Sequence, residues 1–401
     1  MHGLDEARRL VGAQAEPLPA TTCELGLALG LRLAQAVTSD LDLPPFDASA
    51  MDGYAARSLE LVAGKALPVA FEVAAGQTPD ALPAGAVARI FTGAVLPAGA
   101  DLVVVQEQAQ LRDDGRVLLP PASAGENLRR AGELCRQGDA VAENGALLTP
   151  ARLATLAAVG ASRLAVIPRP RVAIVVTGDE LVDVATRPGP GQIRDSNRVL
   201  LEALVREAGC ALVSSGRVGD QLEEHRRALD EAMARSDLVL SSGGVSVGDR
   251  DLVPRVLAEL GARTVLHKVR MKPGKPVLVA RRGNTWVLGL PGNPVSVATA
   301  FRMFARPLIE TLAGDGSAFQ EHALLLPVGA GTGNRGERTL LLPARLTVVE
   351  GRLQVLPLAW KGSHDLVTAA AGDALLRLEP GQECRAGELA AVYALPWRVC
   401  L

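Results

Sequence analysis

The sequence predicts a multidomain α/β protein built around a central three-layer α/β domain. Its 401 residues exceed the roughly 250 to 300 residues that a single hydrophobic core serves. Between residues 169 and 314, short apolar runs alternate with helical stretches, as in a parallel sheet with helices on both faces. Between residues 68 and 120, short β-type runs such as Val69–Val73 and Leu102–Val105 are separated by Gly and Pro turns, which indicates a small β domain.

The central region contains three predicted strands, each followed by a predicted helix. The strands are short apolar runs rich in β-branched residues, and Gly209 and Gly261 end two of the helices. The strands are Arg171–Val176, Cys210–Ser214 and Asp237–Leu240, and the helices are Asn197–Glu207, Leu222–Ala234 and Leu252–Leu260. Ligands of such sheets bind beyond the carboxyl ends of the strands.

The flanking regions predict three further domains. Helical stretches at Cys23–Gln35 and Pro150–Val159 lie on either side of the β-rich region, so we expect a split N-terminal α+β domain (1–45 plus 136–168) that carries an inserted β domain (46–135). Residues 169–314 form the central α/β domain. Apolar runs such as Ala323–Pro327 and Leu389–Tyr393 predict a C-terminal β barrel or sandwich at 315–401.

Composition excludes several classes of protein. Apolar residues make up 48% of the chain and the formal net charge is −2, so no global field favours nucleic acid or a membrane surface. No uncharged apolar run reaches 18 residues. The five cysteines are scattered and odd in number, which favours a reducing, cytoplasmic location. His2, His225, His267 and His322 are interpreted as surface residues.

The stretch "SSGGVSVGDRD" at residues 241–251 combines glycines with carboxylates after an apolar strand. Gly243, Gly244 and Gly248 allow backbone N–H groups to face an anion, although glycines at a strand end are more often plain turn residues. The stretch matches neither GxxxxGK[ST] nor GxGxxG.

Glu180, Asp220 and Asp251 each follow a predicted strand of the central sheet. Singly, each carboxylate is more often a helix cap or a solvated loop charge. Converging carboxylates need a proton or a cation to offset their repulsion, and Mg²⁺ would also bridge them to a phosphate. The sequence therefore predicts a magnesium site at this edge of the sheet.

Two further stretches supply polar groups near the same edge. "HKVRMKPGKPV" places Lys268, Lys272 and Lys275 around a Pro-Gly turn, as an oxyanion clamp or as a solvated face. "GLPGNPVSV" precedes a helix capped by Asn293 or Ser296, whose N-terminus attracts anions or is simply a structural cap.

With these residues in view, the chain resembles the molybdopterin molybdenumtransferase family, which includes the E domain of gephyrin. The resemblance covers the whole chain and rests on "MDGYA", "TGDEL", "RDSNR", "SSGGVSVGDRD", "KPGKP", "GLPGNPVS" and "GSH" in family order. It implies the four-domain architecture above, with a central domain similar to molybdopterin adenylyltransferases, a C-terminal β barrel and an elongated homodimer. It also implies the insertion of molybdate into the dithiolene of adenylylated molybdopterin, with Mg²⁺-dependent release of AMP.

The resemblance carries roles over to matching positions. Glu180, Asp220 and Asp251 look like the magnesium centre, and Lys268 matches a basic active-site position. Asp52 and Thr92 match positions that the β domain contributes to the site of the partner chain. The remaining matches concern the cofactor, phosphate and molybdate sites, and they are Lys272, Lys275, Pro276, Ser363, Gly243, Gly244, Ser246, Gly248, Pro291, Gly292 and Asn293.

Two departures from the family pattern are visible. Leu134 stands where the family usually has a carboxylate, and the C-terminal arginine pattern is not matched cleanly, so Arg338 is the expected molybdate arginine with Arg345 as runner-up. Two alternatives therefore remain open, a molybdopterin adenylyltransferase and a non-catalytic cofactor-binding or scaffold paralogue. A docking adenylyltransferase and molybdoenzyme maturation partners are the expected partner proteins.

Overall fold

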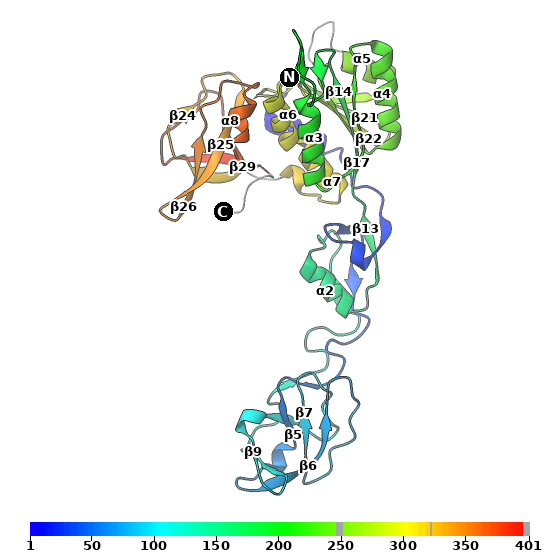
Figure 1. Cartoon of the computed structure of the whole chain (residues 1–401), viewed down its shortest axis with the longest axis vertical. Coiled ribbons are helices and arrows are strands. Elements are labelled where there is room, and N and C mark those ends of the chain that lie inside the picture. The colour runs from blue at the N-terminus through cyan, green and yellow to red at the C-terminus, as the bar shows by residue number, and fades with distance from the viewer. Residues whose placement is uncertain (246–251, 321–322, 396–401) are drawn as a thin grey trace. The chain divides into compact units, whose positions relative to one another are not determined.

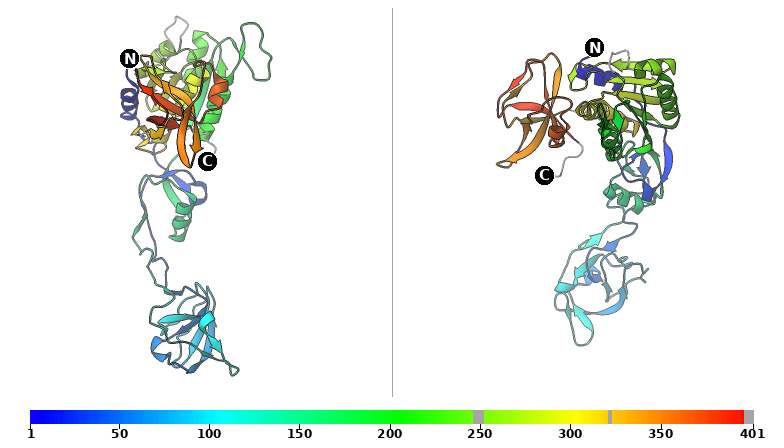
Figure 2. Two further views of the ribbon diagram at one scale, coloured as in Figure 1. Left: turned by 90° about the vertical axis from the view of Figure 1, so that its left-hand side faces the viewer. Right: turned by 45° about the horizontal axis from the view of Figure 1, so that its top comes forward.

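A computed structural model describes residues 1–245, 252–320 and 323–395 of the chain. The described residues fall into two compact units (Figures 1 and 2). One unit comprises residues 1–21, 30–32 and 167–401, and the other comprises residues 22–29 and 33–166. The four-domain division with its boundaries stays a proposal.

The larger unit is organised around a six-stranded sheet of order β17-β14-β18-β22-β21-β19. The strands are β14 (Arg171–Thr177), β17 (Ala211–Val218), β18 (Leu238–Ser242), β19 (Arg263–His267), β21 (Leu278–Arg282) and β22 (Thr285–Leu290). The three predicted strands, which correspond to β14, β17 and β18, are parallel as predicted, and β22 is a fourth parallel strand that was not predicted, whereas β19 and β21 are antiparallel to their neighbours. The Gly283-Asn284 turn explains why β21 is antiparallel to β22, because a two-residue connection joins only antiparallel strands.

Helices cover both faces of this sheet and make it the middle of three layers (Figure 1). Helices α4 and α5 pack on the face that carries Ala173 and Val175. Helices α1, α3, α6 and α7 pack on the face that carries Val172, Ile174 and Val176. The helices are α1 (Leu4–Gly12), α3 (Ser196–Glu207), α4 (Leu222–Arg235), α5 (Leu252–Glu259), α6 (Pro294–Ala300) and α7 (Arg306–Leu312). Alternate residues of β14 thus serve the two cores, as the pleat of a strand requires.

Helix α1 was not predicted, and it belongs to the unit with the central sheet. Leu4, Ala7 and Val11 are buried against that sheet's core at helical spacing. The Arg8 guanidinium donates to the Met303 carbonyl at 2.7 Å.

His225 was interpreted as a surface residue, and this is wrong. The residue is only 1% exposed, because it lies on the buried stripe of α4 with Leu229.

The C-terminal part of this unit is built on a sheet of order β20-β25-β27-β29-β23, with β26 paired to β25. Its elements are β20 (Met271–Lys272), β23 (Leu324–Pro327), β25 (Thr339–Val349), β26 (Arg352–Pro357), α8 (Leu366–Ala370), β27 (Ala374–Leu378) and β29 (Leu389–Ala394), beside the pair β24 (Thr332–Gly333) and β28 (Glu383–Cys384). The two predicted strands at 323–327 and 389–393 are confirmed. Closure into a barrel stays a prediction.

The smaller unit contains a six-stranded sheet of order β8-β5-β7-β6-β10-β9 and shorter pairs. Its elements include β1 (Thr21–Glu24), β2 (Arg32–Leu33), β3 (Val37–Thr38), β4 (Ala48–Ser49), β5 (Gly53–Ala56), β6 (Ala66–Val73), β7 (Val87–Ile90), β8 (Leu102–Val105), β9 (Gln110–Leu111), β10 (Arg116–Leu118), β11 (Leu128–Arg129), β12 (Ala140–Ala142), α2 (Pro150–Ala158) and β13 (Arg163–Ile167). The strand at 102–105 and the helix at 150–159 are confirmed.

The helix predicted at 23–35 is wrong. Only Leu25–Leu27 forms a short 3₁₀ turn, and the flanking residues belong to β1 and β2, which pair with β13. Gly26 and Gly30 explain the failure, because each glycine costs a helix about 1 kcal/mol and Gly30 has a φ of +77°. Within the described ranges, no helix is both long and apolar enough to cross a bilayer.

Candidate functional site

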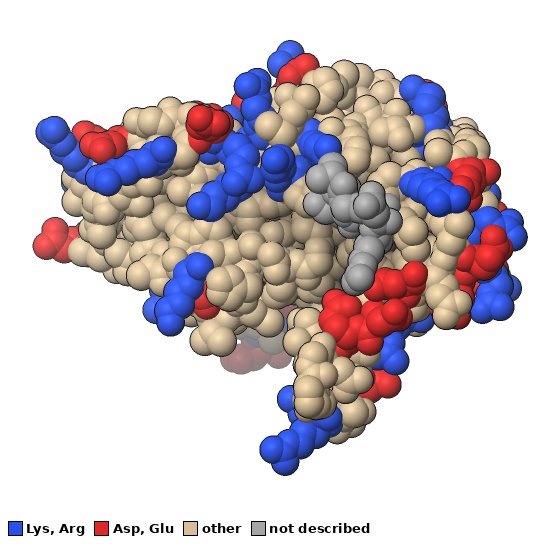
Figure 3. All heavy atoms as spheres, turned by 90° about the horizontal axis from the view of Figure 1, so that it is seen from above, with Lys and Arg blue, Asp and Glu red and all other residues tan. Residues whose placement is uncertain are grey.

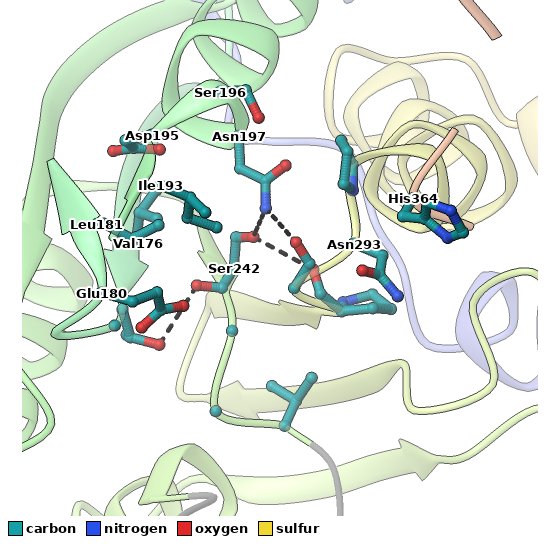
Figure 4. A pocket seen from close by; sticks show the side chains of 18 of the residues that line it. Val176, Glu180, Leu181, Ile193, Asp195, Ser196, Asn197, Ser242, Asn293 and His364 are labelled. Carbon is teal, nitrogen blue, oxygen red and sulfur yellow. Dashed lines mark hydrogen bonds between the residues drawn. The ribbon is translucent and has the colours of Figure 1, made fainter. Parts of the chain in front are cut away.

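A pocket of about 590 Å³ opens beyond the carboxyl ends of β14, β18 and β22 (Figure 4). This is the edge at which the sequence predicts a ligand site. Seven segments of the chain meet there: the turns after β14, β17 and β18, the start of α3, the loop between β22 and α6, the segment before β21, and the residues at the start of α8. The residues that line it from the predicted set are Glu180, Asp220, Gly243, Gly244, Pro276, Pro291, Gly292 and Asn293.

Glu180 and Asp220 supply exposed carboxylates to this pocket. The backbone N–H of Asp220 donates to Asp179 Oδ1 at 3.0 Å, so Asp179 holds the turn after β17 in place. Within the described part of the chain, neither the Glu180 nor the Asp220 carboxylate accepts a hydrogen bond or forms an ion pair. Both are therefore available to a cation or to a hydrogen-bond donor.

The predicted magnesium centre has two described members, because Asp251 lies outside the described residues. Among the residues that the structure describes, no group of three or more His, Cys, Asp or Glu residues could hold a metal ion. Two carboxylates at an open pocket nevertheless fit Mg²⁺, which keeps several water molecules and is often bound by one or two carboxylates plus substrate phosphates.

The glycines after β18 are required by the backbone. Gly243 has a φ of +93° and Gly244 a φ of +64°. A Cβ on Gly243 would lie 2.6 Å from Thr177 Oγ1 and 2.8 Å from the Thr177 carbonyl oxygen. The turn therefore packs directly on the end of β14, and no side chain fits between them. Ser246 and Gly248, also predicted for this turn, lie outside the described residues.

Two polar residues that line the pocket, Asn197 and Ser242, were missed by the sequence-based selection of residues, although they bond to the predicted Pro291 and Gly292. Asn197 Nδ2 donates to Ser242 Oγ at 3.0 Å and to the Gly292 carbonyl at 2.6 Å (Figure 4). Ser242 Oγ donates in turn to the Pro291 carbonyl at 3.2 Å. The "RDSNR" motif, which contains Asn197, was the signal that could have found it.

The C-terminal part of the larger unit contributes to the rim of the pocket. Asn293, the N-cap residue of α6 as predicted, donates through Nδ2 to Ser363 Oγ at 2.9 Å. The Val295 N–H donates to the Ser363 carbonyl at 3.2 Å. His364 and Leu366 line the pocket and were not predicted to do so.

The predicted lysines are not among the residues that line the pocket in the described structure. Lys272 and Lys275 are exposed, and Lys268 is half-buried with a φ of +66°. Arg338 donates to the Met271 carbonyl at 3.4 Å, and Arg345 donates to the Ala371 carbonyl at 3.1 Å. On the face seen from above, one group of basic and one group of acidic side chains stand out, whereas elsewhere on this face the two kinds are mixed (Figure 3).

Asp52 and Thr92, the two predicted residues of the smaller unit, are hydrogen-bonded to each other. Asp52 Oδ1 accepts from the Thr92 N–H at 2.7 Å and from Thr92 Oγ1 at 2.8 Å. These two bonds lower the pKa of Asp52 below its usual range because they stabilise the carboxylate, and the backbone bond has the larger effect. Asp52 thus stays ionised to lower pH than an ordinary aspartate.

Replacing Thr92 with valine is expected to raise the pKa of Asp52. The hydroxyl donor is lost and the backbone donor is kept, so the pKa should stay below that of an unstructured aspartate. Carboxyl-carbon NMR titration of the wild type and the variant measures both values. An unchanged pKa would show that the hydroxyl does not stabilise the carboxylate, and Asp47, whose carboxylate binds Ala131 and Arg130, is the internal control.

Three family models match successive parts of the chain. The MoeA N-terminal region (domain I and II) matches residues 2–160, a probable molybdopterin binding domain matches residues 173–311, and the MoeA C-terminal region (domain IV) matches residues 327–395. The second match contains most of the residues that line the pocket.

Similar proteins and structures agree with these matches. A molybdopterin molybdenumtransferase of Haemophilus influenzae is 39% identical over 78% of this chain and 78% of its own length. One from Staphylococcus aureus is 31% identical over 94% of this chain and 91% of its own length. A crystal structure of a molybdopterin biosynthesis moeA protein from Pyrococcus horikoshii has a TM-score of 0.80 at 25% identity, covering 98% of this chain and 100% of the other. The chain therefore belongs to the molybdopterin molybdenumtransferase family, the transferases of molybdenum cofactor biosynthesis.

Proposed function

We propose that this chain inserts molybdate into the dithiolene of adenylylated molybdopterin and releases AMP in a Mg²⁺-dependent step. The charge of the pocket is the observation that supports this most. Its described lining contains the exposed carboxylates Glu180 and Asp220 against the guanidinium of Arg194, because the third lining carboxylate, Asp195, is buried and paired with Arg198. A pyrophosphate enters such a pocket only with a cation, because like charges held close in a partly desolvated site repel strongly.

Glu180 and Asp220 would hold the magnesium ion, with Asp251 as the proposed third carboxylate. The bound ion would offset charge on the pyrophosphate and polarise the bond to be cleaved. Gly243, Gly244 and the loop of Pro291, Gly292 and Asn293 would accommodate the phosphate region of the substrate. Positioning of this kind supplies up to roughly 7 to 11 kcal/mol of barrier reduction without a covalent nucleophile.

Molybdate would be bound by a second set of residues that carries most of the positive charge. This set consists of Lys268, Lys272, Lys275, Ser363 and Arg338. Ser363 supports the assignment, because Asn293 already donates to its oxygen and its own proton stays available for an oxyanion. Pro276, which lines the pocket, begins the segment that leads from Lys275 into β21.

The proposal includes a cytoplasmic homodimer with a shared site. In it, Asp52 and Thr92 of one chain reach the pocket of the partner chain. The ionised Asp52 carboxylate has one oxygen occupied by Thr92, which leaves the other oxygen for a donor or a cation. A molybdopterin adenylyltransferase and molybdoenzyme maturation proteins are the proposed partners that deliver the substrate and receive the product.

The function is tested by following AMP release from adenylylated molybdopterin and Mg²⁺, with and without molybdate. We expect release that requires both molybdate and Mg²⁺ and stops when the metal is chelated. Formation of adenylylated molybdopterin from ATP and free molybdopterin would instead indicate an adenylyltransferase. The absence of both reactions would indicate a non-catalytic paralogue, in line with the exposed Leu134 in place of the family carboxylate.

A further inference from the structure

Asn197 joins three segments that are distant in sequence. It is the second residue of α3, and its Nδ2 donates to Ser242 at the end of β18 and to Gly292 in the loop before α6. Both protons of one nitrogen are used, and the Gly292 carbonyl can only accept. The orientation of the amide is therefore determined by its partners.

The amide links two walls of the pocket, the Gly243-Gly244 turn and the loop before α6. Both walls carry residues that the proposed function assigns to substrate binding. Its bond to Ser242 holds the residue that precedes the Gly243-Gly244 turn. Its bond to Gly292 holds the residue that precedes Asn293, which in turn binds Ser363. The distance between the glycine turn and the loop that binds Ser363 thus depends on this side chain.

Asn197 is not optimised for stability. Its Oδ1 is buried and has no hydrogen-bond partner within the described residues. A buried acceptor without a partner is unfavourable, so the side chain retains an unfavourable group in order to provide two donors from one atom. Aspartate has no such donor, serine has one, and glutamine places its amide one bond further from the backbone.

We propose that Asn197 is a positioning residue that sets the distance between the glycine turn and the loop before α6. This inference rests on the proposed function, because the distance matters for turnover only if the substrate spans the two walls. Displacing positioned groups by about 1 Å costs on the order of 100-fold in rate. The side chain acts through Ser242 and Gly292 and need not touch the substrate.

The test compares Asn197→Leu with Ser241→Ala. Leucine has a similar size, removes both donors and also removes the buried Oδ1. Ser241 is the matched control, because its buried Oγ likewise has no partner in the described structure and it precedes Ser242 on the same strand. Hydrogen exchange of the backbone amides of residues 242–244, 290, 292, 293 and 295 reports on the two walls, and AMP release reports kcat and KM.

For Asn197→Leu we expect exchange at both walls to become at least about tenfold faster, and kcat to fall by about 100-fold. The Tm should change by no more than about 3 °C, because one unfavourable buried group is lost together with the donors. Ser241→Ala should alter neither exchange nor kcat. A lower Tm of Asn197→Leu with an unchanged kcat of the folded enzyme would indicate a purely structural role. That result would overturn the inference.

The inference and the proposed function can fail separately. Wild-type turnover with unchanged exchange and kcat in Asn197→Leu would overturn the inference alone. Faster exchange at both walls, in a protein that shows no molybdate-dependent AMP release, would overturn the proposed function and leave the link between the walls established.

A double change, Asn197→Leu with Ser242→Ala, tests the link directly, because the two side chains share one hydrogen bond. It should speed exchange at 242–244 by less than the product of the single effects.

Discussion

Replacing Asp220 with asparagine is expected to lower molybdate-dependent AMP release by at least about 100-fold. The variant keeps the size of the side chain and the N–H that binds Asp179, but it removes one of the two pocket carboxylates that have no partner among the described residues. Loss of one group that stabilises developing charge in a partly closed site costs about 10² to 10³ in kcat. Initial rates over a range of Mg²⁺ concentrations measure the effect.

The magnesium dependence distinguishes a metal role from a general charge effect. If Asp220 holds the ion, the Mg²⁺ concentration needed for half-maximal rate should rise, and Glu180→Gln should give the same pattern. Glu259→Gln is the matched control, because it removes one negative charge from the exposed side of α5, where Glu259 pairs with Arg255 at 2.8 Å. Asp220→Asn with an unchanged Mg²⁺ requirement would refute the assignment.

Replacing Gly243 with alanine is expected to destabilise the larger unit by roughly 2 to 5 kcal/mol and to abolish turnover. Alanine at a φ of +93° is strained by about 1 to 2 kcal/mol. The added Cβ also meets Thr177 Oγ1 and the Thr177 carbonyl at distances that require the turn or β14 to move, which adds about 1 to 3 kcal/mol. Thermal and chemical unfolding measure the loss of stability.

Gly261→Ala separates the two causes. Gly261 has a φ of +74°, and nothing lies within 4 Å of the position where its Cβ would be. It should therefore show only the conformational cost and should keep its AMP-release activity. Equal destabilisation of the two variants would mean that the contact with Thr177 does not matter.

Local signals in the sequence were sufficient for elements that depend on local patterns. The run Leu102–Val105 and the helix that begins at Pro150 behind Thr149 have unambiguous periodicity or caps, and both are confirmed. The stretch from Cys23 also contains many helix formers, but pairing with β13 outweighed its weak local preference. The antiparallel edge strands were not distinguished, because strand direction depends on the connections.

The candidate site could be predicted only where a residue's role follows from its own segment. Glu180, Asp220 and Gly243 follow strands of the central sheet, so the edge they share could be inferred. Asn197 could not be chosen this way, because its partners are 45 and 95 residues away in the sequence. His225 was misjudged because its place on the buried stripe of α4 depends on the tertiary packing of that helix.

The position of α1 has a consequence for the order of events during synthesis. Residues 1–21 belong to the same compact unit as residues 167–401, and the whole of the smaller unit is encoded between them. Leu4, Ala7 and Val11 therefore have no core to join until β14 has left the ribosome, whereas the smaller unit can fold first. Helix α1 is therefore synthesised before the smaller unit, but it can pack only after that unit has been synthesised.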